Sequence, residues 1–212
     1  MSSEPIIFLE EVLVKRGNFC LEIPKLQIFT GERVAIVAPS GQGKSTLLML
    51  LAGLISPTKG RVCVCGVDPV SQPPQWRAQQ LAWMGAELEL ATDLRVHEQV
   101  TLAAHLMNHP IPSQDITDEV LNRLGLAGFQ NRTMASLSTG QQQRVALARV
   151  LLHPAPLRLT DEPTASLDKG WSNVCSDLLL GEADAVTVCF ASHDPTLIGR
   201  ADRIISPEGS PP

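Results

Sequence analysis

Short apolar segments separated by turns make up the first part of the chain. Residues 6–14 (IIFLEEVLV) and 19–28 (FCLEIPKLQI) are rich in apolar and β-branched side chains, which predicts two strands. A turn at residues 30–32 follows, and residues 33–37 (RVAIV) form the uninterrupted apolar run that is typical of a strand buried on both faces. We therefore expect three strands before the first helix.

The next part of the chain changes from strands to helices. An apolar segment after a glycine-rich loop predicts a helix from about residue 45 to residue 54, ended by a proline and a glycine. Residues 61–66 (RVCVCG) predict another short strand. The stretch from about 87 to 153 lacks strand-like runs, so we expect it to be mostly helical, with a proline-rich break at 109–112.

Strands and helices alternate again in the last third of the chain. The patterns predict strands near 157–160, 185–190 and 203–205, and a helix near 169–180, while the tail SPEGSPP is expected to be frayed. This alternation around a helical insert predicts the α/β class, with a mainly parallel core sheet and an N-terminal antiparallel β region. We expect residues 1–212 to form a single domain, with the insert at about 87–153.

The composition narrows the class of protein. Apolar residues make up 44% of the 212 and charged residues 18%, which excludes a disordered or fibrous chain. The net charge of −5 disfavours bulk attraction to nucleic acid or anionic lipid. No apolar run approaches the roughly 20 residues that cross a bilayer, and we expect no signal peptide. Five cysteines without a C-x-x-C pair are typical of reduced cytosolic thiols.

A glycine-rich loop, APSGQGKST (residues 38–46), joins the buried strand to the first helix. Such a loop turns backbone N–H groups towards phosphate oxygens at the positive end of a helix. The Lys44 ammonium would neutralise β- and γ-phosphate charge, and the Ser45 hydroxyl would ligate Mg²⁺. The alternative is an ordinary strand–turn–helix with an exposed lysine. The nucleotide-binding residues predicted here are Pro39, Ser40, Gly41, Gln42, Gly43, Lys44, Ser45 and Thr46.

Residues 137–144 (LSTGQQQR) resemble the signature LSGGQ-x-Q-R of the nucleotide-binding subunits of ABC transporters. In that family's order, residues 158–162 (RLTDE) look like the Walker B strand, 166–168 (SLD) like the D-loop, and 191–194 (ASHD) like the segment that carries the switch histidine. Residues 51–66 also match the family's stretch after the phosphate loop. The resemblance covers nearly the whole chain and implies a P-loop ATPase fold that binds ATP and Mg²⁺.

Three side chains beyond the loop would carry the chemistry that the resemblance implies. Asp161, at the carboxyl end of a strand, would hold Mg²⁺ directly or through water. Glu162 would take a proton from the water that attacks the γ-phosphate. His193 would contact the γ-phosphate and position Glu162 and the water, as the family's histidine does. An acidic pair or a histidine at a strand end can also be simply solvated, so the order of the motifs carries this assignment.

The signature also implies a second subunit. The Ser138 hydroxyl and the amides of residues 139–141 lie at a predicted helix N-terminus, which favours an anion. In the family this end reaches ATP held by the P-loop of another subunit, so two nucleotides are enclosed in a two-fold dimer. The residues that the resemblance assigns to nucleotide binding outside the P-loop are Ser138, Gly140, Gln141 and Asp168.

Two departures from the family pattern concern the nucleotide and the metal. Arg16 stands near the position of the aromatic side chain that stacks on adenine, so its guanidinium or the ring of Phe19 would have to take that place. Ala86 stands near the position of the glutamine that touches both the metal and the membrane partner, and Glu87 or Glu89 are the nearest substitutes.

Two further departures concern the backbone. Thr139 replaces the first glycine of the signature, and a β-branched side chain restricts the chain there. Arg158 and Thr160 occupy a strand that would be apolar throughout if it lay inside a parallel sheet. The predicted catalytic and metal-binding residues are nevertheless all present, which favours hydrolysis over an inactive domain.

The resemblance implies an ATP-hydrolysing subunit that powers transport by a membrane permease on a separate chain. We expect it on the cytoplasmic face of the membrane, held there by the permease, with no nucleic-acid partner. The alternatives are an ATP-binding regulatory or degenerate ABC domain with little turnover, and the weak half of a heterodimeric ATPase. The short chain and residues 94–100 (LRVHEQV) resemble the compact ATPases of lipoprotein-release, cell-division and macrolide-exporter systems. Residues 86–131 are expected to dock the permease.

Overall fold

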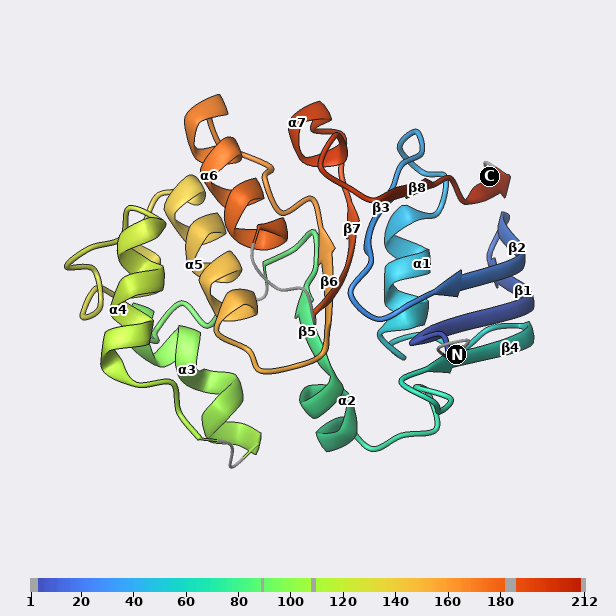
Figure 1. Ribbon diagram of the computed structural model, residues 1–212, viewed down its shortest axis with the longest axis horizontal. Coiled ribbons are helices and arrows are strands. Elements are labelled where there is room, and N and C mark those ends of the chain that lie inside the picture. The colour runs from blue at the N-terminus through green and yellow to red at the C-terminus, as the bar shows by residue number, and fades with distance from the viewer. Residues whose placement is uncertain (1–3, 89, 108–109, 182–185, 211–212) are drawn as a thin grey trace.

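An antiparallel sheet forms one end of the molecule (Figure 1). The computed structural model describes residues 4–88, 90–107, 110–181 and 186–210. Within them the sheet contains β1 (Ile7–Arg16), β2 (Phe19–Ile28), β4 (Lys59–Val64) and β9 (Glu208–Ser210). Their order is β4-β1-β2-β9. β1 and β2 form a hairpin closed by the pairing of Arg16 with Phe19.

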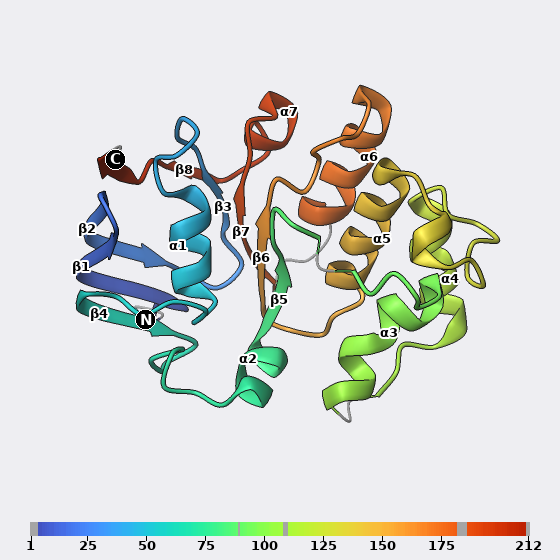
Figure 2. The same cartoon turned by 180° about the vertical axis from the view of Figure 1, so that it is seen from behind.

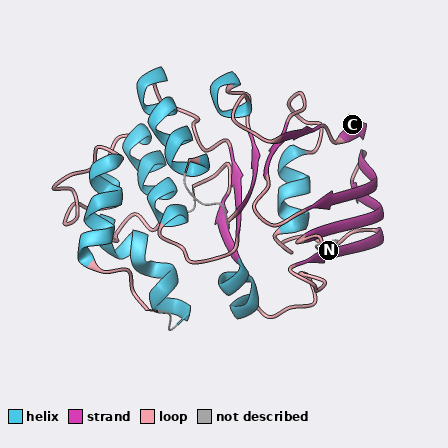
Figure 3. Cartoon of the chain, in the orientation of Figure 1, coloured by secondary structure: helices cyan, strands magenta, loops and turns pink. Residues whose placement is uncertain are grey.

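A parallel sheet lies at the centre of the molecule (Figure 3). Its strands are β3 (Arg33–Ile36), β5 (Leu81–Met84), β6 (Leu157–Asp161), β7 (Thr187–Ala191) and β8 (Arg203–Ile205). Their order is β5-β6-β7-β3-β8, and all neighbouring pairs are parallel. The carboxyl ends of these strands therefore meet at one edge of the sheet.

Helices cover both faces of the parallel sheet. The helices are α1 (Lys44–Leu51), α2 (Pro74–Gln80), α3 (Val96–Met107), α4 (Gln114–Arg123), α5 (Thr139–Leu151), α6 (Lys169–Leu180) and α7 (Pro195–Ile198), with a 3₁₀ turn at Met134–Ser136. In Figures 1 and 2, α1 lies between the two sheets, while α3, α4, α5 and α6 gather on the opposite side of the parallel sheet.

Two apolar cores fill the spaces on the two sides of the parallel sheet. Val34 and Ile36 of β3 belong to the core shared with α1 and the antiparallel sheet, whereas Ala35 belongs to the core shared with α5 and α6. This alternation follows from the two-residue period of a strand. The prediction that this strand is buried on both faces is confirmed, since Val34, Ala35 and Ile36 are all fully buried.

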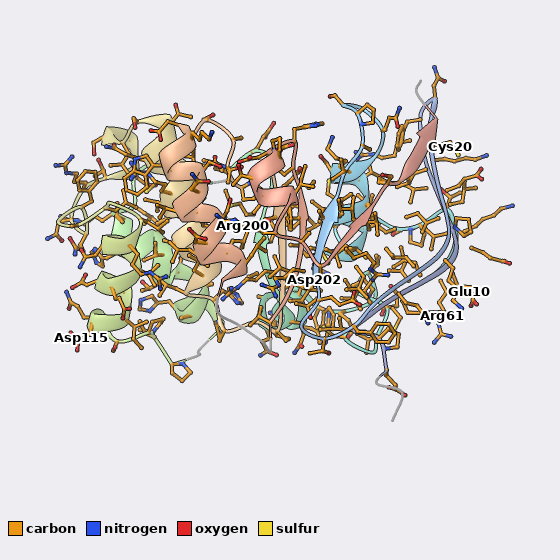
Figure 4. The ribbon with its side chains drawn as sticks, turned by 45° about the horizontal axis from the view of Figure 1, so that its top comes forward. Glu10, Cys20, Arg61, Asp115, Arg200 and Asp202 are labelled. Carbon is orange, nitrogen blue, oxygen red and sulfur yellow. The ribbon has the colours of Figure 1, made fainter. Side chains whose placement is uncertain are left out.

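Charged side chains cover the antiparallel sheet. Glu10 on β1 is paired in register with Lys25 on β2 and with Arg61 on β4. Figure 4 shows Glu10 and Arg61 side by side at this end of the molecule, with Asp115 of α4 at the opposite end. Opposite charges on neighbouring strands stabilise a sheet modestly and keep this face in water.

The fold class predicted from the sequence is confirmed, with an antiparallel N-terminal sheet, a five-stranded parallel sheet and helices. Three local predictions differ from the structure. α2 and β5 were not predicted, and the tail expected to be frayed instead pairs as β9 with β2 through residues 208–210. Residues 109 and 185, at the edges of a predicted break and a predicted strand, lie outside the described residues. Within the described ranges, no helix is both long and apolar enough to span a bilayer.

Candidate active site

A cavity of about 700 Å³ opens at the carboxyl edge of the parallel sheet. Segments that follow β3, β5, β6 and β7 line it, together with the β1–β2 hairpin. The lining residues are Arg16, Phe19, Ser40, Gly41, Gly43, Lys44, Ser45, Thr46, Ala86, Asp161, Glu162 and His193. The structure therefore brings most of the predicted P-loop residues into one cavity with the predicted metal ligands and catalytic side chains.

The register of three neighbouring strands produces this convergence. Ala191, the last residue of β7, pairs with Ile36 at the end of β3 and with Asp161 at the end of β6. The chain leaves all three strands at the same level, so the loops that follow meet there. Ligands bind at this edge in open α/β sheets because loops diverge there and leave a crevice.

Lys44 is buried, with 8% of its surface exposed. Its Nζ donates hydrogen bonds to the carbonyl oxygens of Ala38 at 2.8 Å and Pro39 at 3.4 Å. Nζ also lies 3.0 Å from Nε2 of His193. An ammonium removed from water needs such partners. None of these three partners is a carboxylate, so none of them competes with a phosphate as an anionic partner for Lys44.

Glu162 has an unusual backbone conformation, with φ of 50°. Its N–H donates to the carbonyl oxygen of Ala191 at 2.9 Å, which ties the residue to the end of β7. Its Oε2 accepts a hydrogen bond from the N–H of His193 at 3.3 Å, and its Oε1 lies 3.7 Å from Nε2 of the same histidine. Glu162 and His193 are therefore held next to each other, and both border the cavity.

Asp194, the residue after His193, connects several segments around the site through hydrogen bonds. The Asp194 carboxylate accepts hydrogen bonds from the hydroxyls of Thr164 and Ser172 and from the N–H of Thr196. Burial by itself would raise the pKa of Asp194, but these hydrogen bonds outweigh it and hold the pKa below its ordinary value. Asp194 thus connects the loop after β6, the helix α6 and the loop after β7.

The hairpin end of the cavity presents one cation and one aromatic ring. Arg16 is exposed at the end of β1, and Phe19 is half-buried at the start of β2. A Cβ placed on Gly43 would lie 3.0 Å from Cζ of Phe19, so the ring sits directly against the P-loop. On the opposite side, Ala86 lines the cavity but Glu87 does not, and Glu89 lies outside the described residues.

Six of the predicted nucleotide-binding residues do not line this cavity: Pro39, Gln42, Ser138, Gly140, Gln141 and Asp168. Ser138 and Gln141 form a reciprocal capping box at the start of α5. Asp168 caps α6 by accepting a hydrogen bond from the N–H of Trp171 at 3.0 Å. Helix geometry leaves the amides of Thr139 and Gly140 without a partner inside α5.

The polar residues of the Walker B strand are accommodated without breaking the sheet. Arg158 and Thr160 lie in β6, between β5 and β7. Nη2 of Arg158 donates to the carbonyl oxygen of Leu151 at 3.3 Å, and burial lowers the pKa of its guanidinium. The Thr160 hydroxyl is buried without a hydrogen-bond partner among the described residues. β6 therefore carries an energetic cost that an apolar strand would avoid.

Comparison with known proteins identifies the class to which this fold and site belong. A family model described as ABC transporter matches residues 21–165. The chain is 36% identical over 193 residues to a thiamine import ATP-binding protein of Jannaschia sp. (strain CCS1), covering 89% of this chain and 82% of that protein. It is 35% identical over 201 residues to a lipoprotein-releasing system ATP-binding protein of Legionella pneumophila (strain Lens), covering 89% and 88%.

A solved structure agrees with these relatives. A dimeric ATP-binding cassette in a post-hydrolysis state, bound to ADP and Pi, superposes with a TM-score of 0.84 and 30% identity over 95% of this chain and 94% of that chain. The chain therefore belongs to the ABC transporter family. It is an ATP-binding subunit and ATPase that energises transport. Import and lipoprotein-release relatives match at nearly equal identity.

Proposed function

We propose that the cavity at the carboxyl edge of the parallel sheet holds ATP with its phosphates against the P-loop. The observation that carries this proposal is the meeting of Lys44, Asp161, Glu162 and His193, from the ends of three neighbouring strands, in that one cavity. The P-loop amides and the N-terminus of α1 attract the phosphates, and Lys44 exchanges its carbonyl partners for phosphate oxygens.

The donor set at the end of β6 fits Mg²⁺. The Ser45 hydroxyl is exposed to the cavity, and the Asp161 carboxylate, 3% exposed, lines the same cavity. Mg²⁺ prefers oxygen ligands and keeps several waters, so one carboxylate and one hydroxyl suffice alongside phosphate oxygens. Ser45 and Asp161 would hold the ion. When bound, the ion would neutralise part of the phosphate charge.

Glu162 is the proposed general base. Its carboxylate borders the cavity beside His193, where it takes a proton from the attacking water. His193 lies between Lys44 and Glu162, and it positions the carboxylate through its backbone N–H. Ala86 lines the cavity in the place of a glutamine, so the side chain at this position would supply no ligand to the ion.

The residues outside the cavity are proposed to complete a second site. The start of α5 would present the Ser138 hydroxyl and the amides of Thr139 and Gly140 to ATP held by another subunit, together with Asp168 at the start of α6. The dimeric relative bound to ADP and Pi supports this arrangement. We further propose that a separate membrane permease holds the subunit at the cytoplasmic face of the membrane and receives the work of ATP-driven closure.

The test is steady-state ATPase of the full chain with Mg²⁺ and ATP, comparing wild type, Glu162→Gln and Glu87→Gln. Glu87 is an exposed glutamate after β5 that does not line the cavity, so it is the matched control. We expect Glu162→Gln to lose about 100-fold or more in kcat while still binding nucleotide, because a general base contributes about 10²–10⁴-fold. Glu87→Gln should keep wild-type turnover.

The proposal fails if Glu162→Gln hydrolyses ATP as fast as wild type. The same variant tests dimerisation, because ATP that is bound but not hydrolysed should keep the closed dimer assembled in sedimentation. A Glu162→Gln protein that binds ATP but stays monomeric would indicate that the second subunit is a different chain.

A further inference from the structure

A buried glutamine in α5, within the signature-like stretch, contacts the segment that carries Glu162. Gln143 is 5% exposed, and its immediate neighbours along the helix, from Arg144 to Ala148, are buried too. Its Nε2 donates a hydrogen bond of 2.9 Å to the main-chain carbonyl oxygen of Glu162. Gln143 lies in the signature-like stretch at residues 137–144, and a buried side-chain amide needs a hydrogen-bond partner.

The contact reaches Glu162 at a point where its conformation depends on support. Glu162 has φ of 50°, a region that residues other than glycine rarely adopt. Three hydrogen bonds hold it there: its N–H to Ala191, and its carbonyl oxygen accepting from the N–H of Ala165 at 3.1 Å and from Gln143. The first two bonds come from β7 and from the segment that follows Glu162, whereas the third comes from α5.

α5 also contacts the segment after Glu162 at a second place. A Cβ placed on Gly140 would lie 3.3 Å from the carbonyl oxygen of Ser166, whose φ is 63°. Arg144 stacks over the ring of Trp171 with its Cζ 3.9 Å from the ring centroid. The first two turns of α5 therefore contact the segment from Glu162 to the start of α6 at three places.

We propose that Gln143 is a positioning residue for hydrolysis, which sets the backbone of Glu162 and thereby aims its carboxylate. This inference rests on the proposed role of Glu162 as general base. The N-terminus of α5 is the same end that is proposed to meet the nucleotide of the other subunit. A displacement of α5 then acts on Glu162 directly through the side-chain amide of Gln143, so the carboxylate is aligned when α5 is correctly seated.

The adjacent glutamine provides a matched control. Nε2 of Gln142 donates a hydrogen bond of 3.0 Å to the main-chain carbonyl oxygen of Met134, which is in the 3₁₀ turn before α5. Gln142 and Gln143 thus share residue type, helix and kind of bond, and they differ in the carbonyl that they hold. Methionine has nearly the shape of glutamine and no donor, so Gln→Met removes each bond with little change in volume.

The experiment compares wild type, Gln143→Met, Gln142→Met and Glu162→Gln in one steady-state ATPase series, with nucleotide affinity and thermal unfolding measured for each. We expect Gln143→Met to lower kcat by about 10-fold to 100-fold, since small displacements of a catalytic group cost that much. Its KM and nucleotide affinity should stay within about twofold of wild type, because the P-loop is untouched. Gln142→Met should keep its kcat within about twofold.

Two results would overturn the inference. First, equal losses of kcat in Gln143→Met and Gln142→Met would show that the bond to Glu162 has only a structural role. Second, a loss of nucleotide affinity in Gln143→Met as large as its loss of kcat would show the same. A third measurement adds Gln143→Met to Glu162→Gln: we expect no further loss in single-turnover rate, whereas an independent, multiplied loss would contradict action through Glu162. Wild-type turnover in Glu162→Gln would instead refute the proposed base.

Discussion

Two glycines in the loop after α4 provide a matched pair for testing how α5 is anchored. Gly125 and Gly128 both have left-handed backbones, with φ of 65° and 74°. Their surroundings differ sharply. A Cβ on Gly125 would lie 2.1 Å from Cη2 of Trp171 and 2.8 Å from Nη1 of Arg144, whereas a Cβ on Gly128 would meet nothing within 4 Å.

The two alanine variants should therefore differ by a calculable amount. Both carry the left-handed backbone cost of about 1–2 kcal/mol. Gly125→Ala adds overpacking of about 1–3 kcal/mol and disturbs the stacking of Arg144 on Trp171, worth roughly 0.5–1 kcal/mol. It also pushes on the hydrogen bond of 2.6 Å from Arg144 Nη1 to the carbonyl oxygen of Leu124. We expect losses in the free energy of unfolding of roughly 3–5 kcal/mol for Gly125→Ala and about 1–2 for Gly128→Ala.

Equilibrium urea unfolding followed by tryptophan fluorescence measures both losses. The steric part of the argument is checked with Trp171→Leu, which removes the ring that the new methyl group would strike. In that background, the cost of Gly125→Ala should fall towards the cost of Gly128→Ala. Equal destabilisation by the two alanine substitutions in the wild-type background would refute the reasoning, because it would leave backbone strain as the whole effect.

Three further outcomes are expected. Asp194→Asn should destabilise the protein by about 1–2 kcal/mol at about pH 7. The pKa of Asp194 is lowered in the folded protein, so its carboxylate stabilises the fold above about pH 4 and this stabilisation is lost as the pH falls through the folded pKa. The difference in unfolding free energy between Asp194→Asn and wild type, measured in urea, should therefore disappear in acid. Burial raises the pKa of both Cys175 and Cys189 to about 12. A disulfide reagent at about pH 8 should therefore modify neither thiol until the protein unfolds, and rapid labelling of the folded protein would contradict their burial. Arg16 is one of the two side chains expected to stack on the base, so Arg16→Ala should weaken ATP binding by about fivefold or more but leave tripolyphosphate binding unchanged. Equal weakening of both ligands would place Arg16 on the phosphates instead.

The sequence placed the glycine-rich loop and the polar strand ends where the structure has them, because these are local patterns. Residues 38–46 combine glycine, lysine and hydroxyl groups in one short segment, and the proposed catalytic residues Glu162 and His193 lie within two residues of a strand end. A parallel sheet brings the carboxyl ends of its strands together whatever loops connect them. The meeting of Lys44 with Glu162 and His193 in one cavity followed from that rule.

The missed elements depend on distant partners. β5 is only Leu81–Met84 and exists through its pairing with β6, and α2 is a short helix that a proline begins. β9 contains glutamate, glycine and serine, so its propensity is poor, and it becomes a strand because β2 offers an edge. The contact between Gln143 and Glu162 likewise joins residues that no local pattern connects.

The left-handed conformation of Glu162 has a consequence for how this site tolerates change. Asparagine, aspartate and glycine adopt φ near 50° more readily than glutamate, yet none of them extends a carboxylate as far. Glu162→Gly would relieve roughly 1 kcal/mol of backbone strain and abolish the proposed proton transfer. Backbone strain alone therefore disfavours a glutamate at this position, whereas the proposed proton transfer requires one.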